Sequence, residues 1–436
     1  MTNTISGAPG HLKNSQAGRT FTGFVKYHNQ LPRMQQLTMR EIGGREVVVR
    51  VEAAQTCYTS VEAILRDNTA NDLPFTPEGQ GMVVGHGGVG IVEAIGPQVM
   101  GTRVGDRVVV HLHGSCGRCH SCLHARADKC RNFGLIAEGG LGPQCVDEDG
   151  LDVFTNFGGM AELLITNEEH VTPVFTDVTS EEMSMLTCVG GCGLGMSLIS
   201  CPVEFASDVV VFGAGPVGLS AVQGARIKGA SRIVVVEPIP YRREVAMQLG
   251  ATAAVDPNLY TARHRTDQSQ GAHMRFWEDE LVDHVRSLLP PPTNRLLAGS
   301  QGPAPDHVIE AVGGDLIVPK SEPQGPDPTG VTVLNQCWDL CSRTGTLATS
   351  SFGHPAGSEV SFPATEWSDG SKHHRPGTGG GTNDRRDTPK FVRLMETGQL
   401  DMKTLAARSY PLDDVVAAYQ VCGDREVIAT VVTPNT

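Results

Sequence analysis

The sequence predicts an α/β protein in which a doubly wound parallel sheet follows a mostly-β region. A βαβ pattern occupies residues 208–237, where two apolar, β-branched runs flank a glycine-rich turn and a helix-like segment. Many short strand-like runs precede this unit, and alternating strands and helices follow it. Alternation of strands with helices is typical of a parallel sheet, whereas closely spaced short strands indicate an all-β or partly open barrel-like domain.

The turn of the βαβ unit, GAGPVG at residues 213–218, is a dinucleotide-binding fingerprint. Gly213 permits the tight turn, Gly215 lets the backbone approach a pyrophosphate, and Gly218 lets the helix pack closely on the strand. The phosphates would lie at the helix N-terminus, beside Pro216 and Val217, where unpaired N–H groups favour an anion. Because the carboxylate of Glu237 would accept hydrogen bonds from ribose hydroxyls and repel a 2′-phosphate, the sequence favours NAD over NADP.

Composition places the chain among globular proteins of two or three domains. It has 436 residues, 39% of them hydrophobic, and a formal net charge of −13. It has no apolar run near 18 residues, no secretion signal and no long basic patch, so we expect no membrane span and no nucleic-acid partner. A cytoplasmic location is the default expectation.

Four of the twelve cysteines form the pattern CxxCxxCx7C, at Cys116, Cys119, Cys122 and Cys130. A long chain without a secretion signal uses clustered cysteines for metals more often than for disulfides. Four thiolates complete the tetrahedral coordination of zinc and leave no open position, which is typical of a structural site. An iron–sulfur cluster and four free surface cysteines are the alternatives.

Taken in order, these motifs resemble the zinc-dependent medium-chain dehydrogenase/reductase family, which contains the alcohol dehydrogenases. The resemblance rests on Gly85-His86, the segment RVGDRV at residues 103–108, the four cysteines and the GAGPVG turn, and it runs from about Gly44 to Val432. It implies a GroES-like, mostly-β catalytic domain and a Rossmann NAD-binding domain. It also implies a homodimer or homotetramer and a small alcohol or aldehyde substrate.

The resemblance further implies a catalytic zinc on Cys57, His86 and Cys188, with Cys192 as the rival third ligand. Two thiolates and one imidazole leave the fourth position open, as a Lewis-acid zinc requires. Thr59 corresponds to the hydroxyl residue that takes the proton of the substrate alcohol.

Three neighbouring positions depart from the family pattern. Ser60 stands where an acid commonly orients the ligand histidine, Gly87 replaces the glutamate of the GHE motif, and Glu62 stands where some members carry a relay histidine. Partners of this kind tune metal affinity, with losses of about 10- to 100-fold when they are removed.

The predicted domains are a flexible extension at 1–20, the GroES-like catalytic domain with its structural zinc lobe at 21–189, and the Rossmann domain at 190–378. Residues 379–436 are predicted to return to the catalytic domain, so the active site would lie between the two lobes. Segments 257–305 and 314–331 are interpreted as insertions. The second of them and residues 372–379 resemble the formaldehyde dehydrogenase and dismutase subgroup, in which extra loops are associated with a tightly held NAD. Arg242 or Arg243 could flank the adenosine, or both could lie on a solvated helix face, and Val312 belongs to the segment 306–313 that resembles the family strand near the nicotinamide.

Residues 345–349 are interpreted as the final strand of the sheet, and His373 and His374 as loop residues. In the tail, helices are expected at 390–396 and 412–421, and a strand at 427–432.

The main hypothesis is an NAD-dependent, zinc-containing oxidoreductase that acts on an alcohol/aldehyde pair, with one structural and one catalytic zinc. A second hypothesis is an enzyme that retains its NAD and catalyses aldehyde dismutation or a redox-neutral reaction. A third, motivated by Ser60 and Gly87, is a catalytically silent NAD-binding protein.

Overall fold

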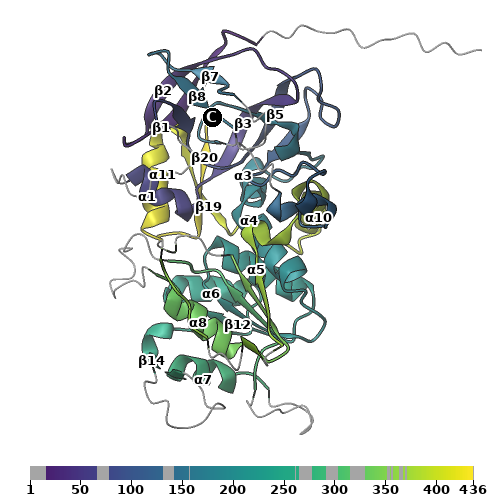
Figure 1. Ribbon diagram of the computed structural model, residues 1–436, viewed down its shortest axis with the longest axis vertical. Coiled ribbons are helices and arrows are strands. Elements are labelled where there is room, and N and C mark those ends of the chain that lie inside the picture. The colour runs from purple at the N-terminus through teal and green to yellow at the C-terminus, as the bar shows by residue number, and fades with distance from the viewer. Residues whose placement is uncertain are drawn as a thin grey trace, which may run out of the picture.

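A computed structural model describes residues 16–435 of the chain. Segments outside the description are 66–77, 131–141, 157, 261, 265–276, 291–302, 315–328, 351–353, 355–356, 363–366 and 369–370. Parts of both predicted insertions therefore lie outside the described residues. Figure 1 shows a β-rich half at one end of the molecule and an α/β half at the other.

The β-rich half begins with a small closed barrel. Its strand order is β1-β2-β7-β8-β4, and its strands are β1 (Thr20–Tyr27), β2 (Arg33–Met39), β4 (Gly81–Val83), β7 (Cys145–Val146) and β8 (Asp152–Phe154). The barrel already includes the end of the predicted extension, because Gly18 N donates to Met39 O at 2.9 Å and β1 begins at Thr20.

A larger sheet continues from this barrel. Its order is β10-β6-β5-β3-β20-β19, with β9 also paired to β3. Its strands are β3 (Glu46–Gln55), β5 (Gly88–Ile95), β6 (Arg107–Val110), β9 (Leu163–Asn167), β10 (Val171–Pro173), β19 (Ala406–Pro411) and β20 (Ala429–Thr433). Val431 lies opposite Gln55 in the antiparallel pair of β20 and β3, so the end of the chain lies against the first half.

The α/β half is built on a parallel sheet of order β13-β12-β11-β16-β17-β18. Its strands are β11 (Asp208–Phe212), β12 (Arg232–Val236), β13 (Ala253–Val255), β16 (His307–Glu310), β17 (Thr346–Thr349) and β18 (His373–Pro376). β11 is fully paired on both sides and its apolar residues Val209–Phe212 are buried, which is typical of a central parallel strand. The predicted fold class, α/β with a doubly wound parallel sheet and a mostly-β region, is confirmed.

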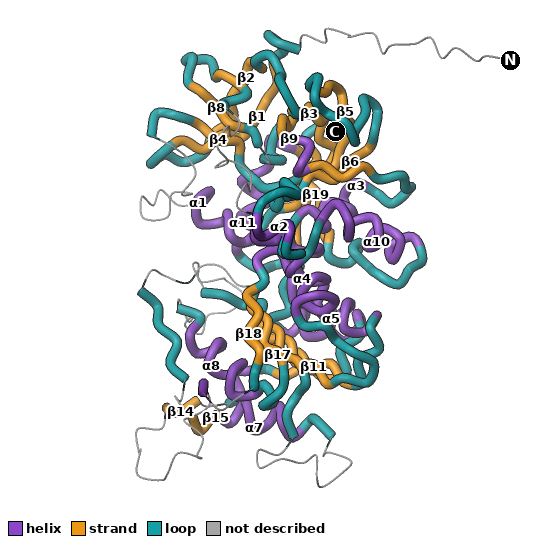
Figure 2. The backbone as a smooth tube through the Cα atoms, turned by 45° about the vertical axis from the view of Figure 1, so that its right-hand side comes forward, coloured by secondary structure: helices purple, strands orange, loops and turns teal. Residues whose placement is uncertain are grey.

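Helices cover the sheets and join the two halves (Figure 2). They are α1 (Val61–Leu65), α2 (His120–Leu123), α3 (Ser180–Ser184), α4 (Val189–Gly195), α5 (Pro216–Ile227), α6 (Pro240–Leu249), α7 (Glu280–Ser287), α8 (Val331–Leu340), α10 (Asp384–Glu396) and α11 (Val415–Gly423). A two-stranded hairpin of β14 (Ala262–His264) and β15 (Trp277–Asp279) precedes α7.

One hydrophobic cluster connects the two halves. It contains Val109 of β6, Leu186 and Leu194 beside and within α4, and Val211 of β11, all at most 2% exposed. Because the burial of apolar surface is the main stabilising contribution to folding, this shared core fixes the segment around α4 between the two sheets.

Two predicted elements differ from the observed ones. The strand at residues 346–349 is not the last of the sheet, because β18 pairs beside it in parallel register. The sequence HHRP of β18 has no apolar alternation, and all four side chains are exposed, so its pattern resembled a loop. In the tail, α10 begins at Asp384 rather than near Lys390, because Asn383 caps the helix through Arg386 N.

No single helix in the described part of the chain is long and apolar enough to cross a membrane. Only the bent pair formed by residues 180–187 and 189–200 has the required length and composition together, with a bend of 58° between its two parts.

Candidate metal centres and dinucleotide site

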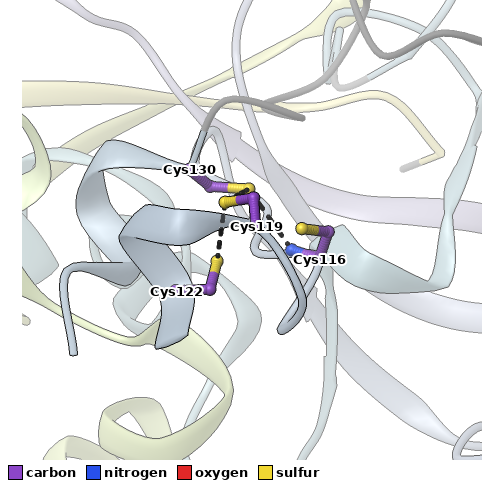
Figure 3. Close-up of side chains that lie close together, drawn as sticks. All are labelled: Cys116, Cys119, Cys122 and Cys130. Carbon is purple, nitrogen blue, oxygen red and sulfur yellow. Dashed lines mark hydrogen bonds between the residues drawn. The ribbon is translucent and has the colours of Figure 1, made fainter. Parts of the chain in front are cut away.

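The four clustered cysteines converge in one small lobe (Figure 3). Their sulfur atoms all lie within 4.8 Å of one another. Cys119 Sγ lies 3.6 Å from Cys122 Sγ and 3.8 Å from Cys130 Sγ, and Cys116 N donates to Cys130 Sγ at 3.4 Å. Four sulfur donors gathered in this way fit a tetrahedral thiophilic ion, with no further donor required.

A second group of donors is assembled from three distant parts of the chain. One sulfur or nitrogen atom from each of Cys57, His86 and Cys188 lies within 4.8 Å of the other two. Cys57 follows β3, His86 lies between β4 and β5, and Cys188 lies directly before α4. The structure therefore brings together the three residues that the family resemblance indicated.

Local backbone geometry explains how each of the three is placed. His86 is flanked by Gly85 and Gly87, whose φ angles of 93° and 104° belong to a left-handed region that glycine tolerates best. Cys57 follows Thr56, whose backbone and hydroxyl bond to Thr430 of β20. Cys188 has φ −150° and ψ −79°, which break the helical path between Met185–Thr187 and α4.

The two thiols of the three-donor group have pKa values that are shifted in opposite directions. A hydrogen bond from Cys188 holds the pKa of Cys57 well below its usual range, and His86 and Thr59 add to this effect. The same contact raises the pKa of Cys188. His86 Nε2 is buried and has no hydrogen-bond partner among the described residues. A buried nitrogen without a partner is costly unless a ligand or water satisfies it, so its place beside two sulfurs fits a metal.

Cys192, the rival ligand, lies outside this three-donor group. Its Sγ is 2.8 Å from Ser350 Oγ and 3.8 Å from Gly377 O. Burial raises the pKa of this thiol to about 11. The geometry thus favours Cys188 over Cys192.

Thr59 differs from its neighbours in being exposed. Its Oγ1 donates to Cys57 Sγ at 3.2 Å. A hydroxyl that contacts the donor group and also faces outward is suitably placed to meet a substrate. Ser60 stands where an acid was expected and Glu62 where a relay histidine was expected. Unlike Thr59, both are buried, with only 4% and 6% of their surface exposed.

Gly87 has a steric explanation. A Cβ at this position would lie 2.5 Å from Thr187 Cβ and 2.7 Å from Val110 O. Together with the positive φ, these contacts exclude a glutamate, so the missing acid of the GHE motif reflects local packing.

The glycine-rich turn has the geometry that the fingerprint predicts. Gly213 has φ 91°, and a Cβ at Gly218 would lie 1.9 Å from Gly213 O. At Gly215 an added Cβ would meet only Arg242 Nη1, at 3.9 Å, so the space before α5 is open. Pro216 is the first residue of α5 and Val217 the second, which leaves this helix N-terminus available to an anion.

The carboxylate of Glu237 lies against this turn. Its oxygens accept from Ala214 N at 2.6 Å and Ile239 N at 3.0 Å, and the residue is 4% exposed. Arg242 is also buried and donates to Tyr241 Oη and Val427 O. Val312 is 41% exposed, and its N–H donates to Glu310 Oε1 at 2.7 Å. Each oxygen of Glu237 keeps a lone pair that could accept from a ribose hydroxyl.

The comparisons identify this combination of a mostly-β half, a parallel α/β half and two donor groups as that of a zinc-binding dehydrogenase. Residues 43–176 match the alcohol dehydrogenase GroES-like domain, and residues 216–318 match the zinc-binding dehydrogenase domain. The chain therefore belongs to the zinc-dependent alcohol dehydrogenase family, and the resemblance inferred from the sequence is confirmed.

Individual relatives agree with this assignment. A probable alcohol dehydrogenase of Pseudomonas sp is 34% identical over 240 residues, which cover 52% of this chain and 73% of the relative. The geraniol dehydrogenase of Castellaniella defragrans is 35% identical over 222 residues, 49% of this chain and 57% of its own length. The chain thus spans a little over half of that enzyme. The crystal structure of an alcohol dehydrogenase zinc-binding domain protein from Burkholderia ambifaria has a TM-score of 0.76 at 25% identity and covers 96% of this chain and 100% of its own.

Proposed function

We propose that the protein is a zinc-dependent oxidoreductase that transfers a hydride between an alcohol/aldehyde pair and NAD. The observation that carries this proposal is the convergence of Cys57, His86 and Cys188, with His86 Nε2 buried and unpartnered among the described residues. When bound, zinc supplies a Lewis acid and NAD a hydride acceptor. The family assignment supports this function over an aldehyde dismutase or a silent NAD-binding protein.

Some residues of the chain would bind the two zinc ions, and one would transfer a proton. Cys57, His86 and Cys188 would hold the catalytic zinc and leave its fourth position for the substrate oxygen. The Thr59 hydroxyl, exposed and in contact with Cys57, would relay the substrate proton by accepting it while passing its own proton on to solvent. Cys116, Cys119, Cys122 and Cys130 would hold a structural zinc that stabilises their lobe.

The cofactor would lie along the N-terminus of α5. Gly213, Gly215 and Gly218 would let the pyrophosphate approach the backbone, and the carboxylate of Glu237 would receive the ribose hydroxyls. Because Glu237 is buried against the turn by two backbone hydrogen bonds, it has little freedom to move away from a 2′-phosphate. This geometry supports NAD in preference to NADP.

The protein's location and assembly also belong to the proposal. The proposed location is the cytoplasm, which stays an expectation. A homodimer or homotetramer follows from the family resemblance alone.

The decisive experiment combines metal analysis with a substrate screen on the same sample. We expect two zinc ions per chain and an increase in NADH absorbance with a subset of primary alcohols, together with much slower turnover when NADP replaces NAD. One zinc per chain and no turnover with any alcohol or aldehyde would overturn the proposal.

A further inference from the structure

A buried polar cluster lies beside the three-donor group and has no part in the function described above. It is formed by the segment 111–113 that follows β6 and by the first turn of α10. Leu112 N donates to Thr187 O at 3.2 Å, which ties this segment to the residue before Cys188. His111 Nε2 lies 3.3 Å from Thr388 Oγ1 of α10. Helix α10 also packs against α4, the helix that begins after Cys188 (Figure 2).

Asp384 is the acid at the centre of this cluster. Its side chain is 12% exposed, and Oδ2 lies 3.9 Å from Nδ1 of His111, which is 1% exposed. His111 Nδ1 has no hydrogen-bond partner in the described part of the chain. Asp384 Oδ1 accepts from Thr382 Oγ1 at 2.8 Å. The carboxylate therefore faces imidazoles and a hydroxyl and is largely shielded from solvent.

Asp384 carries a negative charge at neutral pH, even though burial raises its pKa to about 6. His113 and Thr382 favour the charged form, whereas His113 itself has its pKa lowered to about 4 by burial and is neutral. Of the four cations of α10, Arg386 and Lys390 form ion pairs with Asp387 and Arg393 with Glu396; in the described part of the chain no ion pair joins Arg385 to Asp384. The charged or titratable groups that act on Asp384 from its own helix and from the elements around it are His111, His113, Asp128, Cys188, Cys192 and Asp387.

Within the described ranges, no lysine or arginine forms an ion pair with Asp384, and His111 is neutral because burial lowers its pKa to about 3. A buried anion in such surroundings destabilises a fold, so its presence beside a candidate metal site needs a reason. The two positions that usually supply an acid near the ligand histidine cannot do so here. Position 60 is a serine, and position 87 has no room for a side chain. Helix α10 packs against α4, which begins directly after Cys188, and the charge of Asp384 is the smallest of the causes that raise the pKa of the Cys188 thiol.

We propose that Asp384 is a positioning residue for the Cys57–His86–Cys188 site, where its charge replaces that of the acids missing from positions 60 and 87. This inference rests on the proposed function. Adding a dication to a site that already contains a thiolate reduces its net negative charge, and a nearby fixed anion favours the loaded state. Because Asp384 lies outside the three-donor group, it would act on the site through its charge.

The test compares the full-length protein with Asp384→Asn, which keeps the shape of the side chain and removes its charge. Zinc release to a chromophoric chelator is followed in both proteins, together with their thermal midpoints. We expect the more labile zinc to leave the variant about 10-fold more readily, as is typical when a partner of a ligand residue is lost. The second, tighter zinc should be retained equally, and the thermal midpoint at pH 8 should rise.

Two controls separate this role from a structural one. Asp401→Asn removes another partly buried acid of the C-terminal segment, which bonds to Thr404 N and Oγ1, and it should leave zinc release unchanged. At pH 5 the wild-type carboxyl is mostly protonated, so the difference between wild type and Asp384→Asn should shrink. A purely structural effect would persist at both pH values.

The outcomes also separate this inference from the proposed function. If the wild type holds only one zinc, the proposed function fails. If the wild type holds two and Asp384→Asn retains both as tightly, only the role of Asp384 is overturned. Equal loosening of both zincs with a lower thermal midpoint would likewise overturn it, since that result describes general destabilisation.

Discussion

The two cysteine-containing sites differ in how far apart their residues lie in the sequence. The four-cysteine lobe is contained in residues 116–130, whereas the three-donor group joins residues 57, 86 and 188. The first offers four sulfur donors, and the second offers three donors beside the exposed Thr59. Under the proposed function, the local site would serve stability and the assembled site would serve chemistry, since reaction requires an open position.

Among the substitutions that would test the different roles of the two sites, Cys57→Ala is expected to have the largest effect. Loss of one of three donors should release the catalytic zinc and lower turnover by at least about 10³-fold, because a Lewis-acid metal contributes several kcal/mol to transition-state stabilisation. The four-cysteine site should remain loaded, so elemental analysis should give one zinc per chain. Cys145→Ala, at a buried cysteine outside both groups, is the matched control. Full activity of a Cys57→Ala protein that holds a single zinc would contradict the division of roles.

The reciprocal change is Cys119→Ala in the lobe. Opening a closed structural site should cost on the order of 4 kcal/mol of stability, because metal loss is among the most destabilising single changes. Turnover per correctly folded molecule should change little. Thermal denaturation and active-site titration on the same preparation measure the two quantities. A specific loss of turnover at unchanged thermal midpoint would reverse the assignment of the two sites.

A smaller effect is expected for Thr59→Ala. Removal of a proton-accepting hydroxyl should lower kcat by about 10²-fold, within the usual contribution of general acid–base groups. Zinc content should not change, because Thr59 contacts the donor group without belonging to it. Thr59→Ser retains the hydroxyl and should restore most of the rate. If Ser and Ala variants are equally slow, Thr59 has a packing role instead.

The smallest effect concerns pH and the buried acid beside the assembled site. Because the pKa of Asp384 rises from an ordinary value near 4 to about 6 on folding, the folded state binds the proton more tightly. The stability due to this group is therefore complete below about pH 4 and is lost as the pH rises through 6. Asp384→Asn should gain up to about 3 kcal/mol relative to wild type over that window. Thermal midpoints measured at pH 4, 5, 6 and 8 would show the gain growing with pH, and a constant difference would contradict it.

Local patterns in the sequence predicted the lobe and the βαβ unit because every determining residue lies within a short segment. Residues 116–130 and 213–218 are examples, and both appear in the structure as expected. By contrast, no spacing rule relates Cys57 to Cys188, and only the order of several motifs suggested that they meet. Cys188 and Cys192 are four residues apart, about one helical turn. Only the structure shows that the sulfur of Cys188, and not that of Cys192, lies within the donor group.

Other features escaped prediction because they depend on long-range packing. The edge strand β18 is exposed on every side chain, so its pairing with β17 left no alternating pattern. Asp384 and His111 are 273 positions apart and meet only because α10 packs beside the segment that follows β6. The sequence shows that position 87 carries no acid. Only the structure shows the reason, which is that Thr187 occupies the space that a side chain at position 87 would need.

The pairing of β20 with β3 has a consequence for how the protein is made. β3 is synthesised early, yet its neighbour, together with the contact that Asn435 Nδ2 makes with Val51 O, comes from the last residues of the chain. During synthesis on the ribosome, β3 can pair with β5 and β9, while its last residues, Ala54 and Gln55, remain unpaired until β20 has been made. An unpaired edge of this kind can bind other strands, so nascent or C-terminally shortened chains should be the forms of this protein most prone to aggregation and most dependent on chaperones.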